Sequence, residues 1–385
     1  MSHSDAEQSR NVMIVAGEAS GDLHGSNLIK AAAEYHSQLN FFGVGGAKMQ
    51  VAGCRIIFPS DELSVMGVVE VVRQLPQIYR HFRQLKRVLM SSERPDLLIL
   101  IDFPDFNLRL AKVAKAAGVP VLYYISPKVW AWRSGRAKVI AERVDRLALI
   151  FPFEPQIYES LGVKAEYVGN PLLDEFMENQ PQGMLRDSLG IEIDTQVIGI
   201  FPGSRNSELT HILETLVETV ELLHHEKPDA KFLLPVAPSL SRGAIEKRFS
   251  GTGLPIFIVE ENIYEVAAAC NAVLTVSGTV TLQLALVGTP MAILYKVAPL
   301  SYAIGKRLIK IEYAGLTNIV AGRGIVREFI QDAAEPISMC HEVLRLLDDQ
   351  KYIATMCQDL TEVRQLLGEP GCSVRVAEIA AEMAA

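Results

Sequence analysis

The sequence predicts an α/β protein with two doubly wound parallel sheets and a helical C-terminal tail. Short apolar runs, typical of buried strands, recur along the chain with segments of helical period between most of them. Hydrophobic residues make up 49% of the chain although 21% are charged, a balance that strands buried on both faces explain. At 385 residues the chain is too long for one ordinary core, so we expect two domains.

Each apolar run has the length of a single strand. The predicted strands are Val12–Ala16, Phe41–Val44, Leu97–Ile101, Val121–Ile125, Leu147–Phe151, Val197–Phe201, Phe232–Val236, Ile256–Val259, Ala272–Val276 and Met291–Leu294. Helices are expected over Leu108–Ala117, Leu209–His225 and Ile263–Ala269. Strands that alternate with helices imply βαβ units, and hence Rossmann-like domains.

The two domains are expected to meet near residue 170. Gly169–Pro171 and Asn179–Gly183 are rich in Pro, Gly, Asn and Gln, which is typical of a linker. We therefore predict one domain over residues 1–170, a second over 171–336, and C-terminal helices over 337–385 with an interruption at Pro370-Gly371.

One uncharged stretch, Val266–Tyr295, is long enough to suggest a transmembrane helix. Ser277-Gly278, Gly288 and Pro290 divide it, however. The stretch therefore predicts a buried strand, helix and strand.

Composition excludes several function classes. The net charge of −8 argues against a nucleic-acid partner held by overall charge. The five cysteines and eight histidines form no metal-ligand spacing, and the scattered cysteines suit a reducing cytoplasm. The segment Gly43–Lys48 begins like a dinucleotide fingerprint but has Lys48 at the third glycine position, and no P-loop motif occurs. The polar segment Met1–Arg10 does not resemble a signal peptide. No cofactor or metal is expected.

The first loop that could carry chemistry is Gly17–Asp22, directly after the first predicted strand. Ligands of open α/β sheets bind at the carboxyl ends of strands. Carboxylates at positions 18 and 22 suit hydroxyl groups or a proton transfer better than a phosphate. The alternative is that Asp22 caps the following helix and Glu18 is solvated.

A second acidic loop follows the strand Leu97–Ile101. Asp102 stands before a proline turn, where a general base would be held rigidly. We expect Asp105 or Asn107 to cap the next helix, and favour a functional role for Asp102.

Two loops of the second half have the composition of anion sites. Gly203, Ser204, Arg205 and Glu208 lie at a strand end and helix start, where backbone N–H groups, the helix dipole and a guanidinium converge. Ser204 as a plain N-cap would explain the serine but not the arginine. The second loop is Ser277-Gly278-Thr279, which either caps a buried helix or binds a ligand. Two such loops in one domain suggest a diphosphate, as in a nucleotide sugar.

Two further segments are unusual. The loop Ser126–Arg133 contains both tryptophans, Trp130 and Trp132, which pack the loop onto the domain or line a substrate site. Residues 63–90 combine an apolar cluster with a basic amphipathic helix, which indicates either an interfacial membrane contact or a core helix with a solvated basic face. The apolar cluster includes Val65, Met66, Val68, Val69 and Val72.

Together these segments resemble the lipid-A-disaccharide synthase family over nearly the whole chain. The motifs that carry the resemblance are V-A-G-E-A-S-G-D (Val15–Asp22), V-M-G-x-x-E-V (Val65–Val71), I-D-x-P-D-F-N (Ile101–Asn107), S-P-x-V-W-A-W-R (Ser126–Arg133), P-G-S-R-x-x-E (Pro202–Glu208), S-G-T (Ser277–Thr279) and N-x-x-A-G-R (Asn318–Arg323). The resemblance implies a GT-B fold, in which two Rossmann-like domains face a cleft.

The resemblance also implies an activity. Such an enzyme is an inverting, metal-independent glycosyltransferase that joins UDP-2,3-diacylglucosamine to 2,3-diacylglucosamine 1-phosphate, forming a β-1,6 disaccharide and UDP. It lies peripherally on the inner membrane, on its cytoplasmic side, as a dimer that exchanges C-terminal parts. The apolar cluster of residues 65–72 would contact the membrane.

By the same resemblance, Asp102 would deprotonate the acceptor 6-hydroxyl. Glu18, Ser20, Asp22 and Trp130 would lie on the acceptor side. The donor side would comprise Gly203, Ser204, Arg205, Glu208, Ser277, Gly278, Thr279, Gln283 and Asn318.

Two positions depart from the family pattern. Gln283 stands where the family usually has the glutamate that holds the ribose hydroxyls, and Asn170 stands where it often has a histidine. Glutamine keeps one hydrogen-bond acceptor but lacks the charge. The alternatives to this function are another GT-B transferase, a UDP-sugar epimerase, or a membrane-associated nucleotide- or lipid-binding protein without catalysis.

Overall fold

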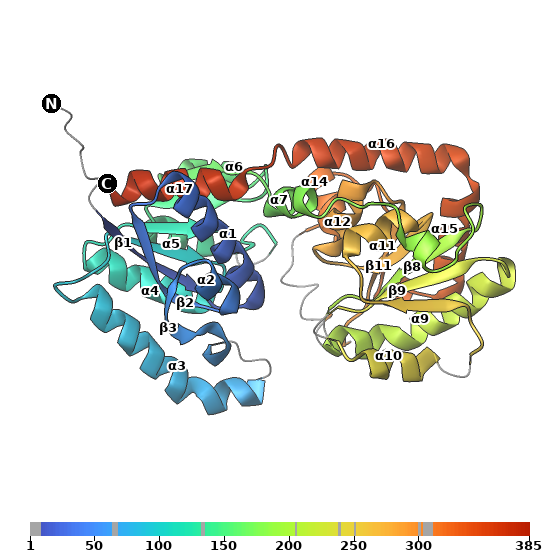
Figure 1. Ribbon diagram of the computed structural model, residues 1–385, viewed down its shortest axis with the longest axis horizontal. Coiled ribbons are helices and arrows are strands. Elements are labelled where there is room, and N and C mark those ends of the chain that lie inside the picture. The colour runs from blue at the N-terminus through green and yellow to red at the C-terminus, as the bar shows by residue number, and fades with distance from the viewer. Residues whose placement is uncertain are drawn as a thin grey trace. The chain divides into compact units, whose positions relative to one another are not determined.

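The chain folds into two compact α/β units, shown in a computed structural model (Figure 1). Unit 1 comprises Met1–Pro171 and Glu369–Ala385, and unit 2 comprises Leu172–Gly368. The structure describes residues 9–63, 68–131, 135–204, 206–237, 240–249, 252–298, 302 and 311–385, with the backbone alone at 68–74, 206–208 and 244.

Unit 1 is built on a seven-stranded parallel sheet with helices on both faces. Its strands are β1 (Arg10–Ala16), β2 (Leu39–Gly45), β3 (Arg55–Pro59), β4 (Leu97–Ile101), β5 (Val121–Tyr124), β6 (Arg146–Leu149) and β7 (Lys164–Tyr167), in the spatial order β3-β2-β1-β4-β5-β6-β7. The helices are α1 (Ala19–Tyr35), α2 (Ala47–Val51), η1 (Ser60–Glu62), α3 (Val68–Leu89), α4 (Pro104–Ala116), α5 (Arg136–Arg143), α6 (Pro155–Tyr158), η2 (Glu159–Leu161) and α17 (Cys372–Ala384). The order reverses between β1 and β4, which marks the ligand edge of such a sheet.

Unit 2 repeats this plan with six parallel strands. They are β8 (Val197–Phe201), β9 (Lys231–Pro235), β10 (Ile256–Val259), β11 (Ala272–Val276), β12 (Met291–Tyr295) and β13 (Glu328–Ile330), in the order β10-β9-β8-β11-β12-β13. The helices are α7 (Pro171–Glu178), α8 (Leu185–Ser188), α9 (Asn206–Glu226), α10 (Arg242–Phe249), α11 (Ile263–Ala269), α12 (Val280–Val287), α14 (Leu316–Ala321), η3 (Gln331–Ala333), α15 (Pro336–Asp348) and α16 (Gln350–Leu366).

The core of unit 1 lies on both faces of its sheet because successive side chains of a strand point to opposite sides. Met13 and Val15 of β1 join one cluster with residues of α3, α4 and α5. Val12 and Ile14 join the other cluster with residues of α1 and α17. Helices therefore cover both faces, as the apolar strands predict.

All ten predicted strands are present, and the expected α/β class is confirmed. The three strands that the sequence analysis missed, β3, β7 and β13, each lie at an edge of a sheet. Edge strands are buried less than central ones, and β7 has no buried residue. They therefore lack the continuous apolar run by which a central strand is recognised.

The uncharged stretch Val266–Tyr295 is confirmed as alternating short elements. It contains the end of α11, then β11, α12 and β12. Among the described residues, no helix has both the length and the apolarity needed to cross a membrane.

The C-terminal helices are divided between the units. Helices α15 and α16 belong to unit 2, and the chain then returns through residues 367–371 so that α17 packs against α1 of unit 1 (Figure 1). Ion pairs from Arg146 of β6 to Glu166 and Glu382 hold α17 at that sheet.

The predicted linker at Asn179–Gly183 is anchored to unit 2. The Glu265 carboxylate of α11 accepts hydrogen bonds from the backbone N–H groups of residues 182, 183, 184 and 185, at 2.6–3.3 Å. Polar composition predicted a loop here correctly, but this contact makes the segment part of unit 2.

Candidate active site

Asp102 lies at the carboxyl end of β4 in an unusual backbone conformation. Asp102 and Phe103 have φ of 44° and 47°, and Ile125, at the end of the neighbouring strand β5, has φ of 63°. The preceding residues Ile101 and Tyr124 pair in the sheet, so the two turns are adjacent. Positive φ is costly for residues other than glycine and persists only where surrounding contacts enforce it.

Buried polar side chains enforce the Asp102 conformation. The Tyr123 hydroxyl donates a 2.5 Å hydrogen bond to the carbonyl oxygen of Asp102. The Asn107 amide donates to the same oxygen at 2.8 Å and to the carbonyl of Ile101 at 3.2 Å. Tyr123 and Asn107 are fully buried. Burial, followed by the nearby charge of Asp102, raises the pKa of Tyr123 well above its usual range, so the hydroxyl stays a donor.

The expectation that Asp105 or Asn107 caps the following helix is wrong. Helix α4 has no side-chain cap: Asp105 pairs with Arg136 at 2.5 Å, and Asn107 bonds backward to the strand. The Phe103 ring packs against Gly17, where a Cβ would lie 2.4 Å from the ring. Glycine at position 17 therefore lets the loops after β1 and β4 meet.

The surroundings of Asp102 favour its protonated form more than water does. Burial raises the pKa of Asp102, the Glu18 carboxylate raises it further, and the Lys128 ammonium and a backbone hydrogen bond oppose the rise. A carboxylate with a raised pKa is a stronger base than one in water. Asp102 is only partly buried.

The residues of the first loop have separate placements. Glu18 and Ser20 are exposed, and Glu18 lies close enough to Asp102 to raise the pKa of that carboxyl. Asp22 is only 6% exposed and accepts hydrogen bonds from the backbone N–H groups of Gly46, Lys48 and Met49 at 2.6–3.1 Å. Its carboxylate stabilises the start of α2. The Asp22 oxygens are thus engaged within the fold, and the place of this residue on the acceptor side stays a prediction.

Trp130 is held by a carboxylate that the sequence analysis did not single out. Its indole N–H donates to Glu154 at 3.1 Å, and its ring packs edge-on against Phe151 and Phe153. Trp130 keeps a partly exposed face, whereas Glu154 is 2% exposed. The geometry permits both alternatives for Trp130, packing the loop onto the domain and lining a substrate site. Trp132 and Arg133 lie outside the described residues.

The first anion loop of unit 2 follows β8. Gly203 has φ of 88° and turns the chain into α9, and Ser204 is exposed at that turn. Arg205 lies outside the described residues, and Glu208 is described by its backbone in α9 alone. In a glycine turn before a helix of this length, the first backbone N–H groups of the helix point toward the end of the preceding strand.

The second anion loop lies between β11 and α12. The Ser277 hydroxyl donates to the carbonyl of Ala314 at 2.6 Å, Gly278 has φ of 155°, and Thr279 precedes the first turn of α12. The Gln283 amide donates to Glu175 of α7 at 3.1 Å. Position 283, where the family usually has a glutamate, therefore has a glutamine that contacts the carboxylate of Glu175 from α7.

Asn318 is placed inside the fold. It is 1% exposed, donates to Val326 and Glu328 at 2.8 Å, and accepts from the N–H groups of Ile325 and Val326 at 2.9 Å. Its hydrogen-bonding groups are thus satisfied within unit 2. Asn318 fixes the loop after α14, and its contact with the donor stays a prediction.

Asn170, the other departure from the family pattern, is 1% exposed in unit 1. Its amide donates to the carbonyl of Ile150 at 3.0 Å.

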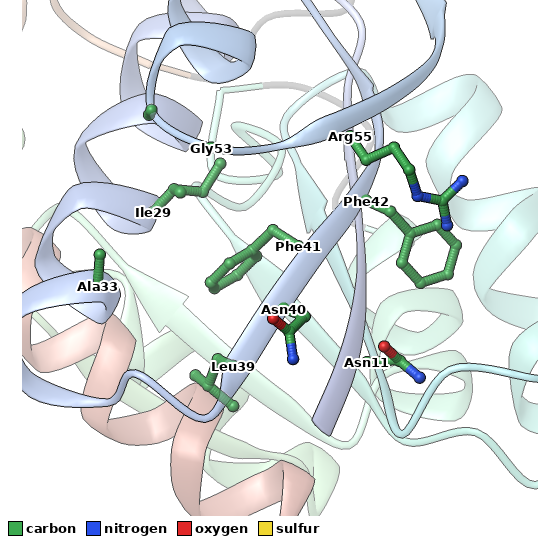
Figure 2. Close-up of a pocket in the computed structure, with 10 residues that line it drawn as sticks. Asn11, Ile29, Ala33, Leu39, Asn40, Phe41, Phe42, Gly53 and Arg55 are labelled. Atoms are coloured by element: carbon green, nitrogen blue, oxygen red, sulfur yellow. The ribbon is translucent and has the colours of Figure 1, made fainter. Parts of the chain in front are cut away.

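A cavity of about 380 Å³ in unit 1 lies away from Asp102, at the start of the strands (Figure 2). Its lining includes Asn11 of β1, Asn40 and Phe41 of β2, and Arg55 of β3. None of the predicted site residues lines it. Among the described residues, no group of three or more His, Cys, Asp or Glu side chains could hold a metal ion.

The predicted membrane segment is described in part. Val65 and Met66 lie outside the described residues, and Val68, Val69 and Val72 belong to α3 with their backbone alone described. Farther along α3, Phe82, Leu85 and Leu89 pack on the core. Leu75, Tyr79, Arg80, Arg83 and Arg87 of the same helix are exposed.

Two parallel-sheet α/β units of this kind define the class of GT-B-type proteins. Solved structures share this fold. A UDP-GlcNAc 2-epimerase from Neisseria meningitidis superposes with a TM-score of 0.66 at 13% identity, covering 97% of this chain and 100% of its own. MurG from Acinetobacter baumannii superposes with a TM-score of 0.59 at 13% identity, covering 97% and 99%.

Sequence comparison gives the family. The model of lipid-A-disaccharide synthetase matches residues 12–383. The lipid-A-disaccharide synthase of Syntrophotalea carbinolica is 54% identical over 98% of this chain and 97% of its own length, and that of Geobacter metallireducens is 47% identical over 97% of each. The chain belongs to the lipid-A-disaccharide synthase family and is a glycosyltransferase of lipid A biosynthesis.

Proposed function

We propose that this enzyme transfers 2,3-diacylglucosamine from its UDP donor to the 6-hydroxyl of 2,3-diacylglucosamine 1-phosphate, with Asp102 as the general base. The products are the β-1,6-linked disaccharide 1-phosphate and UDP. The observation that carries the proposal is the rigid placement of the Asp102 carboxylate at the carboxyl end of β4, beside the point where the strand order reverses.

In the proposed reaction Asp102 accepts the proton of the acceptor hydroxyl as its oxygen attacks the anomeric carbon. The bond from that carbon to the UDP oxygen breaks, and the configuration inverts. A general base contributes about 10²–10⁴ in rate when it is within hydrogen-bond reach of the hydroxyl. The strained Asp102–Phe103 turn, fixed by Tyr123 and Asn107, supplies that positioning.

Unit 2 is proposed to bind the UDP moiety. The helix starts after Gly203 and Gly278 provide N–H groups for the diphosphate, and Arg205 together with Ser204 and Thr279 would stabilise the charge on the leaving UDP. Gln283 and Glu175 lie together beside the second of these helix starts and would contact the ribose. Glu208, the last residue of the motif Pro202–Glu208, is proposed to lie on the donor side as well.

The enzyme is further proposed to lie peripherally on the cytoplasmic face of the inner membrane, where both acylated substrates partition. The exposed basic residues of α3, with Tyr79 beside Arg83, suit an interfacial helix on anionic lipid. The apolar cluster of residues 65–72 would insert at its start. A homodimer that exchanges C-terminal parts is proposed as well, since the C-terminal helices are divided between the two units.

Asp102→Asn tests the assignment of the base. With acylated donor and acceptor, UDP release should fall at least about 100-fold while the melting temperature stays near that of the wild type. Asp61→Asn, at an exposed acid of η1, is a matched control and should retain turnover. Retained turnover in Asp102→Asn removes Asp102 as the base. UDP-GlcNAc supplied alone should yield no epimer.

A further inference from the structure

The most deeply buried acid of the strand-end region is one that the proposed chemistry does not use. Glu154 follows β6 and is 2% exposed. One carboxylate oxygen accepts the Trp130 indole N–H at 3.1 Å, and the other accepts the backbone N–H of Phe151 at 3.1 Å. A buried carboxylate is costly to keep without such donors.

These contacts join two neighbouring loops at the carboxyl edge of the sheet. Phe151 and Phe153 flank the indole edge-on, and they stack on each other at 5.6 Å. At the start of the loop after β5, the Ser126 hydroxyl lies 2.7 Å from the Tyr158 hydroxyl of α6. This loop is therefore held at Ser126 and at Trp130 by the segment that follows β6.

The same loop reaches the electrostatic surroundings of the base. Lys128 lies between the Ser126 and Trp130 anchors, and its ammonium lowers the pKa of both Asp102 and Glu154. Burial nevertheless raises the pKa of Glu154 to about 7, against the hydrogen bonds from Trp130 and Phe151. The loop that contains Trp130 thus begins beside the Asp102 turn.

We propose that Glu154 is a positioning residue for the acceptor, because it fixes the Trp130 indole so that its exposed face packs against the apolar face of the acceptor sugar. Aromatic rings offer such a face at low entropic cost because they have few rotatable bonds. The inference rests on the proposed function, since it assigns the acceptor to unit 1.

The experiment compares Michaelis constants for the two substrates. Glu154→Met removes both carboxylate oxygens while keeping a similar side-chain volume. The KM for the acceptor sugar should rise about tenfold, and the KM for the UDP donor should stay unchanged. Glu154→Gln keeps one oxygen and should raise it by only about twofold to threefold. Glu159→Met, at an exposed acid of η2, is the matched control and should match the wild type.

A double-mutant cycle separates positioning from general stability. Trp130→Phe keeps a ring against Phe151 and Phe153 but has no N–H group. In the Trp130→Phe background, Glu154→Met should no longer change the acceptor KM, although it should still lower the melting temperature through the Phe151 N–H.

Several outcomes would overturn the proposal. One is an acceptor KM that stays unchanged in Glu154→Gln and in Trp130→Phe. Another is a donor KM that rises as much as the acceptor KM. The third is a double variant whose acceptor KM rises by the product of the two single effects, which would mean that Glu154 and Trp130 act independently. If Glu154→Met does not fold, the cycle is run with Glu154→Gln. Failure of the proposed function is distinguishable, because the wild-type enzyme would then form no disaccharide from these substrates.

Discussion

The Tyr123 hydroxyl donates a 2.5 Å hydrogen bond to the carbonyl oxygen of Asp102, from the strand next to the one that Asp102 ends. The bond is made to the backbone of the proposed base, so it fixes the direction of the side chain without using either carboxylate oxygen. Asn107 supplies the second donor to the same carbonyl. The base is thereby held in a left-handed conformation that few residues adopt unaided.

Tyr123→Phe tests this support. The variant keeps the ring but leaves the Asp102 carbonyl with Asn107 alone, so we expect kcat to fall about tenfold and stability to fall by about 1 kcal/mol. Steady-state kinetics and urea unfolding would measure the two effects. Tyr35→Phe, at a tyrosine 57% exposed, should change neither. An unchanged kcat in Tyr123→Phe would mean that Asn107 suffices to hold the turn.

The pH dependence of turnover should respond oppositely to two neighbouring charges. Asp102 acts as a base only when ionised, so kcat/KM should fall as the pH drops through its raised pKa. Glu18→Gln removes a charge that raises this pKa, so the acid limb should move to lower pH. Lys128→Met removes a charge that lowers the pKa, so the limb should move to higher pH.

The two variants serve as controls for each other, because a nonspecific loss of activity would not shift the limb in opposite directions. Shifts of the same sign, or an acid limb that stays in place in both variants, would assign the titration to a group other than Asp102.

Asn318→Asp should act mainly on stability. An aspartate would place a carboxylate oxygen against Glu328 and the Val326 carbonyl, where the amide now donates at 2.8 Å. We expect a loss of about 2–4 kcal/mol in the free energy of unfolding, measured by urea denaturation. Asn179→Asp, at an exposed amide, should cost under about 1 kcal/mol. Lost turnover with unchanged stability would instead indicate direct contact of Asn318 with the donor.

Membrane association should depend on the start of α3. Replacing Val68, Val69 and Val72 together with serine should shift the enzyme from pelleted anionic vesicles to the supernatant, since apolar insertion and basic attraction act together. High salt should weaken binding further by screening Arg80, Arg83 and Arg87. Val51→Ser, at a valine 86% exposed in α2, is the control. A triple variant that pellets like the wild type would place the membrane contact elsewhere.

The central elements could be predicted because their signals are local. A strand buried on both faces is a continuous apolar run, and ten such runs became ten strands. The position of Asp102 followed in the same way, because a polar residue directly after a buried strand must lie at the carboxyl edge of the sheet. The division of the stretch Val266–Tyr295 at Ser277-Gly278, Gly288 and Pro290 was equally local.

The roles of individual polar residues could not be predicted because they depend on partners distant in sequence. Glu18 and Asp22 are one helical turn apart at the start of α1, yet the Asp22 carboxylate binds the start of α2 while Glu18 stays exposed near Asp102. The role of Glu154 could not be predicted because its partner Trp130 lies in the loop after a different strand, β5.

By itself, the sequence determined the α/β class, the strand that Asp102 follows, and the family. The tertiary structure decided which carboxylates are exposed, such as that of Glu18, and which accept hydrogen bonds from backbone N–H groups, such as that of Asp22. The physical reason is that apolar burial produces a local periodicity in the sequence, whereas the hydrogen bonds of a buried polar group depend on which donors the fold brings to it.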